Sequence, residues 1–104
     1  MIHLIDDNAL IRLLKSSDYV ERFKGEYYFI ERKLNRLENM LEKWRKGTLD
    51  FEPKTPMPVL EMQAVQMRQY LATLESRAKI EGITFSEMDG CVINDLVYRP
   101  VQHI

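Results

Sequence analysis

Aromatic and basic residues share one side of the segment 19–46 and form the clearest candidate for binding chemistry. They are Tyr28, Phe29, Arg32, Lys33 and Arg36. Residues four positions apart are neighbours on a helix, so Tyr28 lies beside Arg32 and Phe29 beside Lys33. Because aromatic rings stack on bases and guanidinium groups bind phosphate, the row predicts a site for a small nucleotide or an acidic protein surface. In the alternative interpretation, Tyr28 and Phe29 are core beneath an N-terminal helix and the cations are its solvated edge.

A weaker counterpart, Arg68 with Tyr70 and Arg77, lies on the second expected helix, which follows the connector 47–58 and ends at Glu81. Tyr70 and Arg77 are seven positions apart and therefore share a stripe, beside the polar residues Gln63, Gln66 and Thr73. Polar residues in an apolar helix can line a ligand groove or fix the register and oligomeric state of a bundle. The sequence leaves both interpretations open.

Residues that could catalyse a reaction are scarce. His3 and His103 lie at opposite ends of the chain, and neither has a carboxylate or cysteine at metal-ligand spacing. The single cysteine, Cys91, excludes an internal disulfide. The chain has no Gly-rich phosphate loop, HExxH, CxxC or nucleophile elbow. We therefore expect no catalytic residue, no metal and no cofactor.

Two long helices are expected to position the candidate residues, because apolar residues recur alternately every three and four positions. That spacing averages 3.5 residues and gives each helix one straight seam. The first seam consists of Val20, Phe23, Tyr27, Ile30, Leu34, Leu37, Leu41 and Trp44. The second consists of Leu60, Ala64, Met67, Leu71, Leu74 and Ala78. The pattern predicts an all-α fold built on a long antiparallel hairpin.

Residues typical of helix ends set the expected boundaries. The N-terminal caps are Asp6 or Asp7, then Asp18, which forms a capping box with Glu21; the left-handed stops are Gly47 and Gly82. Pro58 fits the first turn of the last helix. We expect a single domain over 1–104, with a short N-terminal helix in 1–17, the hairpin in 18–82 and a small C-terminal element in 83–104.

The C-terminal segment allows two structures. Val92-Ile93 and the run 96–98 flank Asn94-Asp95, which is compatible with a tiny β-hairpin. A short helix after Ser86 is the alternative, and Asp89-Gly90 is a turn in either case.

Several large apolar residues lie off the two seams. They are Tyr28, Phe29, Met40, Val59, Met62, Tyr70 and Ile80. Burying such a side chain contributes about 1.5–3 kcal/mol, so the terminal segments or a second subunit should cover them. Because long hairpins pair readily into four-helix bundles, we expect a homo-oligomer.

The composition excludes several classes of protein. The net charge is −1, and the segment 19–46 carries eight Lys and Arg against five Glu, which falls short of the basic surface of a sequence-specific DNA-binding protein. No apolar run approaches the roughly 20 residues of a membrane span, and the N-terminus lacks the features of a secretory signal. We expect a soluble cytoplasmic protein.

The middle of the chain resembles a family of small proteins encoded by phages and prophages of gut bacteria, including crAss-like phages. The resemblance covers about residues 20–83. Its most specific features are the loop Gly47-Thr48-Leu49-Asp50-Phe51, the prolines Pro53 and Pro56, and the ending Arg77-Ala78-x-Ile80-Glu81-Gly82. The layout is also distantly similar to the helical hairpin of phage sponge proteins that counter CBASS and Thoeris immunity. These resemblances imply a counter-defence role in the bacterial host cell.

Three functions follow as hypotheses. The first is a non-enzymatic protein that sequesters a cyclic nucleotide immune signal, with Arg32, Arg36 and Arg77 on phosphate and Tyr28, Phe29 or Tyr70 on bases. The second is a protein–protein inhibitor of a host defence or other host protein, comparable to an anti-CRISPR. The third is a small structural or assembly protein of the virion.

Overall fold

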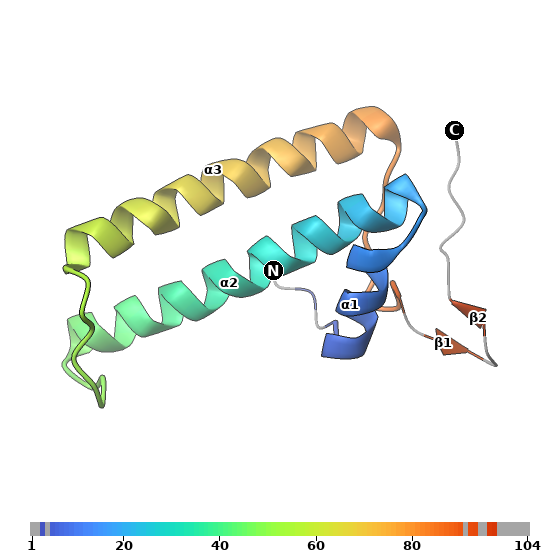
Figure 1. The fold of residues 1–104 in the computed structure, drawn as a ribbon. Coiled ribbons are helices and arrows are strands. Elements are labelled where there is room, and N and C mark those ends of the chain that lie inside the picture. The colour runs from blue at the N-terminus through green and yellow to red at the C-terminus, as the bar shows by residue number, and fades with distance from the viewer. Residues whose placement is uncertain (1–2, 4, 91, 94–95, 98–104) are drawn as a thin grey trace.

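Three helices form the structure, a computed structural model in which residues 3, 5–90, 92–93 and 96–97 are described. The helices are α1 (Asp7–Lys15), α2 (Tyr19–Lys46) and α3 (Met57–Glu81). The long helices α2 and α3 run antiparallel, and α1 packs on α2 near the end that lies away from the connecting loop (Figure 1). The molecule is elongated, with extents of 46 × 30 × 21 Å. The expected all-α hairpin with a short N-terminal helix is confirmed.

The two predicted seams meet between α2 and α3. On α2 the buried seam residues include Phe23, Leu34 and Leu41, and on α3 they include Leu71 and Leu74. The remaining seam residues are buried or partly buried against this core. The 3-4 spacing therefore identified the faces that pack in the hairpin.

Helix ends follow the predicted residues, with one difference in mechanism. Asp6 caps α1 by accepting the backbone N–H of Ala9 at 2.8 Å, and Gly47 ends α2 with φ of 73°. The predicted capping box at the start of α2 is wrong, because the Asp18 side chain makes no capping bond. Instead, the Ser16 hydroxyl accepts the backbone N–H of Asp18 at 3.0 Å and donates to the Glu21 carboxylate. In a capping box, that carboxylate would itself accept the N–H of Asp18.

Both ends of α3 also contain the residues that the sequence analysis predicted for them. Pro58 lies in the first turn, where a missing N–H costs nothing, and Gly82 ends the helix with φ of 71°. After α3 the chain turns at residues 86–90, where a helix was one alternative. It continues into two short antiparallel strands, β1 (Val92–Ile93) and β2 (Leu96–Val97), with Val92 paired to Val97. The β-hairpin alternative is therefore confirmed, although Asn94, Asp95 and Tyr98 lie outside the described residues.

Candidate functional site

The structure divides the predicted aromatic–basic row of α2 into a buried part and an exposed part. The Tyr28 side chain is buried, with 2% of its surface exposed. Arg32 contacts the Asp7 carboxylate and the backbone carbonyl of Ile5, so it ties α1 and the preceding segment to α2. Phe29 is exposed, as are Lys33 and Arg36. For Tyr28 and Arg32, these contacts match the structural interpretation of the row.

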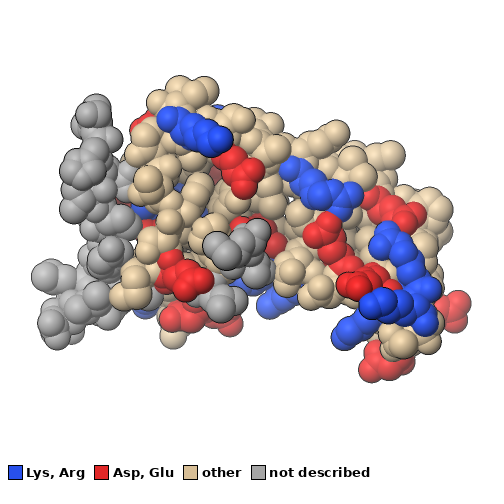
Figure 2. Space-filling view, turned by 180° about the vertical axis from the view of Figure 1, so that it is seen from behind, with Lys and Arg blue, Asp and Glu red and all other residues tan. Residues whose placement is uncertain are grey.

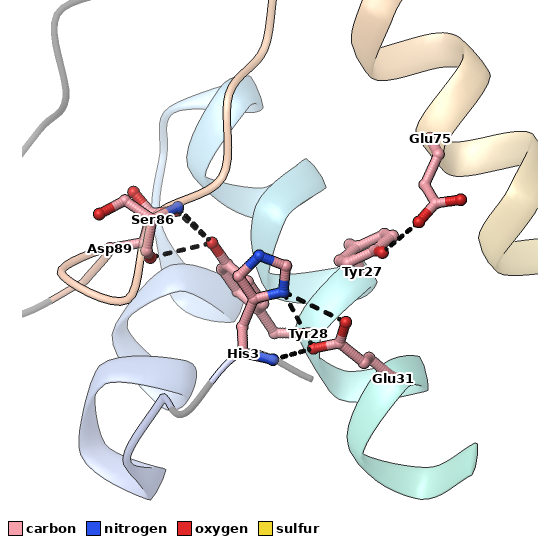
Figure 3. Close-up of polar contacts among 7 residues, drawn as sticks. All are labelled: His3, Tyr27, Tyr28, Glu31, Glu75, Ser86 and Asp89. Atoms are coloured by element: carbon pink, nitrogen blue, oxygen red, sulfur yellow. Dashed lines mark hydrogen bonds and ion pairs between the residues drawn. The ribbon is translucent and has the colours of Figure 1, made fainter. Parts of the chain in front are cut away.

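Tyr28 belongs to a buried polar cluster that fixes the turn after α3 (Figure 3). Its hydroxyl donates to the Asp89 carboxylate and accepts the backbone N–H of Ser86 at 3.0 Å. Asp89 is 1% exposed, and its second oxygen lies 3.2 Å from Lys24 Nζ, which is also buried. Burial raises the pKa of Tyr28, and the hydrogen bond to Asp89 raises it further, so the phenol keeps its proton and remains a donor.

Two further contacts in Figure 3 join α2 to its neighbours. The backbone N–H of His3 donates to Glu31 at 2.8 Å, and the Tyr27 hydroxyl donates to Glu75 of α3 at 2.7 Å. Burial raises the pKa of Tyr27, and the bond to Glu75 adds to the rise. Among the described residues, no three His, Cys, Asp or Glu side chains are placed to hold a metal ion. The contacts of the cluster hold the N-terminal segment, α3 and the turn at residues 86–90 against α2.

In the second predicted pair, on α3, one residue is exposed and the other contacts α2. Tyr70 is exposed, whereas Arg77 donates to the Tyr19 hydroxyl at 2.9 Å and lies 4.9 Å above the ring of Phe23. At 3.6 residues per turn, the exposed part of the α2 row lies roughly 110° around the helix from the seam that faces α3, on one flank of the hairpin.

The exposed α2 row continues to the loop end of the hairpin. Phe29, Lys33, Arg36, Met40 and Lys43 follow one another at intervals of four, three, four and three residues, which keeps them on one side of the helix. Arg36, in the middle of α2, is therefore part of a row that reaches the last turn of the helix. At one end of the row the Lys33 ammonium lies 5.4 Å from the centroid of the Phe29 ring.

At the other end of the row, the connector between α2 and α3 and the last turns of α2 border an open groove. The backbone N–H of Thr48 donates to the Lys43 carbonyl at 2.9 Å, while Gly47 donates to Trp44 at 3.0 Å. The groove has a volume of about 550 Å³, and we call it the loop-end groove. Its lining consists of Arg36, Asn39, Met40, Lys43, Thr48, Leu49, Asp50 and Phe51.

The loop-end groove combines free cations with an exposed aromatic ring. Within the described part of the chain, Arg36 and Lys43 enter no ion pair, and 56% of the Phe51 surface is exposed. Asp50 and the negative end of the α2 dipole oppose an anion here, although backbone N–H groups of the connector bond to the carbonyls of Lys43 and Trp44 in the last turn of the helix. Basic side chains gather at this end of the hairpin in Figure 2, with acidic ones among them.

Sequence reasoning included Arg36 in the candidate site but missed Lys43 and Phe51. Lys43 is seven positions from Arg36, and this spacing puts it in the same row. Phe51 entered only as part of the resemblance. Its position depends on how the connector lies against α2, and residue spacing within a helix carries no signal for that.

A comparison with protein-family models matches residues 17–80, more than half of the chain, to the model described as Sequestin. The chain therefore belongs to the Sequestin family, a family of phage anti-defence proteins. It is accordingly a non-enzymatic protein that sequesters a signalling molecule. Neither the curated proteins nor the solved structures contain a match to the chain. No described helix is both long and apolar enough to span a membrane.

Proposed function

We propose that this Sequestin-family chain captures a cyclic nucleotide immune signal in the loop-end groove and along the exposed α2 row. Arg36 and Lys43 bind the phosphates, and Phe51 or Phe29 stacks on a base. Lys33 adds charge beside Phe29. Tyr28 and Arg32, first considered as ligand contacts, act through the scaffold, while Tyr70 and Arg77 on α3 form a second, weaker candidate set.

The observation that carries this proposal is the pair of uncommitted cations beside an exposed ring. Arg36 and Lys43 have no ion-pair partner among the described residues, whereas Arg45 is paired with Glu61 and Arg68 with Glu38. A phosphate could therefore bind without displacing a carboxylate already bound. Hydrogen bonds to charged groups contribute about 1.5–3 kcal/mol each, which corresponds to roughly tenfold to a hundredfold in affinity per contact.

Sequestration requires binding without turnover, and the groove suits that requirement. Its polar side chains are two cations, an amide, a hydroxyl and one carboxylate, and it contains no histidine or cysteine that could act as a base or nucleophile. Asp50 is the one group there with a basic oxygen. A bound nucleotide should consequently be held intact and released unchanged when the protein unfolds.

Native mass spectrometry with a panel of cyclic di- and trinucleotides and cyclic ADP-ribose isomers tests the proposal. We expect the wild-type chain to retain discrete nucleotide masses and to return the same masses after denaturation. The double variant Arg36→Ala/Lys43→Ala should lose at least tenfold in affinity, with weaker binding at higher salt. The control Arg45→Ala/Lys46→Ala removes two cations of α2 that do not line the groove and are paired with Glu61 and Glu42, and it should bind within threefold of wild type.

Other outcomes of that experiment favour the remaining hypotheses. Retention of no nucleotide, together with a stoichiometric protein partner recovered from host lysate, would favour inhibition of a host protein by the same exposed cations. Presence in purified virions would favour a structural or assembly role. We further propose that the chain acts in the cytoplasm of a bacterial host, that it comes from a gut phage or prophage, and that it assembles as a homo-oligomer.

A further inference from the structure

Thr48 joins the connector to the last turn of α2 by two bonds to one carbonyl group. Its backbone N–H donates to the Lys43 carbonyl at 2.9 Å, and its hydroxyl donates to the same carbonyl at 3.3 Å. The first bond, together with the bond from the Gly47 N–H to the Trp44 carbonyl, forms the Schellman motif that ends many helices. Any residue other than proline can make that bond. The second bond needs a hydroxyl group, so it depends on the side chain at this position.

Beyond Thr48 the connector has no polar attachment to α2. Among the described residues, no hydrogen bond or ion pair joins residues 49–55 to that helix. The next backbone bonds are those that the Pro56 carbonyl accepts from Val59 and Leu60 at the start of α3. In Figure 1 the connector leaves the end of α2 and loops past it on the side away from α3 before it returns. Thr48 is therefore the last residue that fixes this loop to α2 by hydrogen bonds.

Phe51 lies three residues beyond this anchor, on the connector side of the loop-end groove. Its surface is 56% exposed, and among the described residues its ring enters no aromatic pair and no cation–π contact. Arg36 and Lys43 lie on the α2 side of the groove. Lys43 thus belongs to both sides, because its side chain lines the groove and its carbonyl anchors the connector. The bonds of Thr48 consequently join the side that carries the ring to the side that carries the cations.

We propose that Thr48 is a positioning residue of the ligand site, whose hydroxyl holds the Phe51 ring across the groove from the two cations. Thr48 acts on the base through the ring and leaves the phosphate contacts of Arg36 and Lys43 in place. A ring that is held before binding loses less conformational freedom when a base stacks on it, and this raises the affinity. The inference rests on the proposed function, because it requires that the groove binds a nucleotide.

The substitution Thr48→Val tests the proposal, because valine keeps the shape of threonine and lacks the hydroxyl donor. Isothermal titration with each nucleotide of the panel that wild type retains measures the effect. One hydrogen bond between neutral groups corresponds to roughly threefold to tenfold in an equilibrium constant, and we expect a loss of affinity of that size. Thr48→Ser keeps the donor and should restore the wild-type affinity. The matched control Thr55→Val removes another exposed hydroxyl of the connector, outside the groove, and should bind as wild type does.

A double-mutant cycle separates a positioning residue from a direct ligand contact. Phe51→Ala should lower the affinity by at least about fivefold, because a base loses its stacking partner. In the Phe51→Ala background, Thr48→Val should have no further effect, because the ring through which it acts is absent. Equal losses from Thr48→Val in both backgrounds would show that the hydroxyl acts on the nucleotide without the ring, and would overturn the proposal. Wild-type affinity in Thr48→Val or in Phe51→Ala would overturn it as well.

A measurement without nucleotide tests the anchor itself. Backbone NMR order parameters of residues 49–51 should be lower in Thr48→Val than in wild type or Thr48→Ser, because the loop has lost its last bond to α2. Equal order parameters in the three chains would overturn the positioning role. Circular dichroism of Thr48→Val should match wild type, because the substituted side chain is exposed.

The titrations also separate this inference from the proposed function. A loss of affinity in Arg36→Ala/Lys43→Ala, combined with wild-type affinity in Thr48→Val, would overturn the positioning role and leave the groove as the nucleotide site. Retention of no nucleotide by wild type would overturn the proposed function first, and the positioning role with it.

Discussion

At the end of the hairpin where α1 packs, cations are engaged in contacts that hold the fold, whereas nearer the loop end the two groove cations enter no ion pair among the described residues, although their neighbours Arg45 and Lys46 do. Arg12 donates to the Gly90 carbonyl at 2.7 Å, Lys24 pairs with Asp89, and Arg32 contacts Asp7. In the loop-end groove, Arg36 and Lys43 have no such partner in the described structure. Helix α2 therefore uses Lys24 and Arg32 in contacts that hold the fold and leaves Arg36 and Lys43 for the ligand site proposed above.

The largest expected effect concerns the buried pair at the α1 end. Replacing Asp89 with Ala leaves Lys24 charged and buried without its partner, and such a loss costs about 3–5 kcal/mol in the free energy of unfolding. Asp50→Ala at the exposed loop end should change that free energy by no more than about 0.5 kcal/mol. Urea denaturation of both variants makes the comparison; equal effects would show that the two ends do not differ in this way.

Two glycines with the same backbone conformation give a second comparison. Gly47 has φ of 73° and open space where a Cβ would lie, whereas Gly90 has φ of 76° and a Cβ there would lie 2.6 Å from the Ala9 carbonyl oxygen. Left-handed strain costs about 1–2 kcal/mol at either site, and crowding adds about 1–3 kcal/mol at Gly90 only. Thermal unfolding should thus show Gly90→Ala as clearly less stable than Gly47→Ala, and the reverse order would contradict the tight docking of the turn on α1.

Alkaline pH should weaken the α1 end through Tyr28. Its pKa is raised above the ordinary 10.0 in the folded state, so the stabilisation is fully present below pH 10 and is lost as pH rises further, when only the unfolded chain releases the proton. The free energy of unfolding should fall by about 1.4 kcal/mol per pH unit from this group. Urea denaturation at pH 9, 10 and 11 measures the slope; an unchanged slope in Tyr28→Phe would contradict the assignment.

The smallest expected effect on stability belongs to the groove cations themselves. Arg36→Ala/Lys43→Ala should alter the free energy of unfolding by no more than about 0.5 kcal/mol, because both side chains are exposed and, among the described residues, unpaired. Arg32→Ala should cost more, about 1 kcal/mol, because it removes contacts to Asp7 and Ile5. Chemical denaturation measures the free energy of unfolding of both variants. A loss for Arg36→Ala/Lys43→Ala as large as that for Arg32→Ala would contradict the distinction between cations that hold the fold and cations of the groove.

The sequence predicted local features well and missed those set by distant residues. The seams, the glycine stops and the position of Pro58 were predictable because 3-4 spacing and helix-end preferences act within a few residues. The contact between Lys24 and Asp89 joins positions 65 residues apart, and no local pattern pairs them. Tyr28 is likewise buried by a turn that is distant in the sequence, so its spacing could not decide between a buried residue and a ligand contact. The groove was not expected because it depends on how the connector lies against α2.

Hydrogen–deuterium exchange with and without the tightest-binding nucleotide of the panel tests most directly that the loop end of α2 is the ligand site. We predict slower amide exchange in residues 36–51 on binding and unchanged exchange in residues 19–31 and 83–90. Protection confined to the α1 end, with none in 36–51, would contradict the account and return the site to the Tyr28 region.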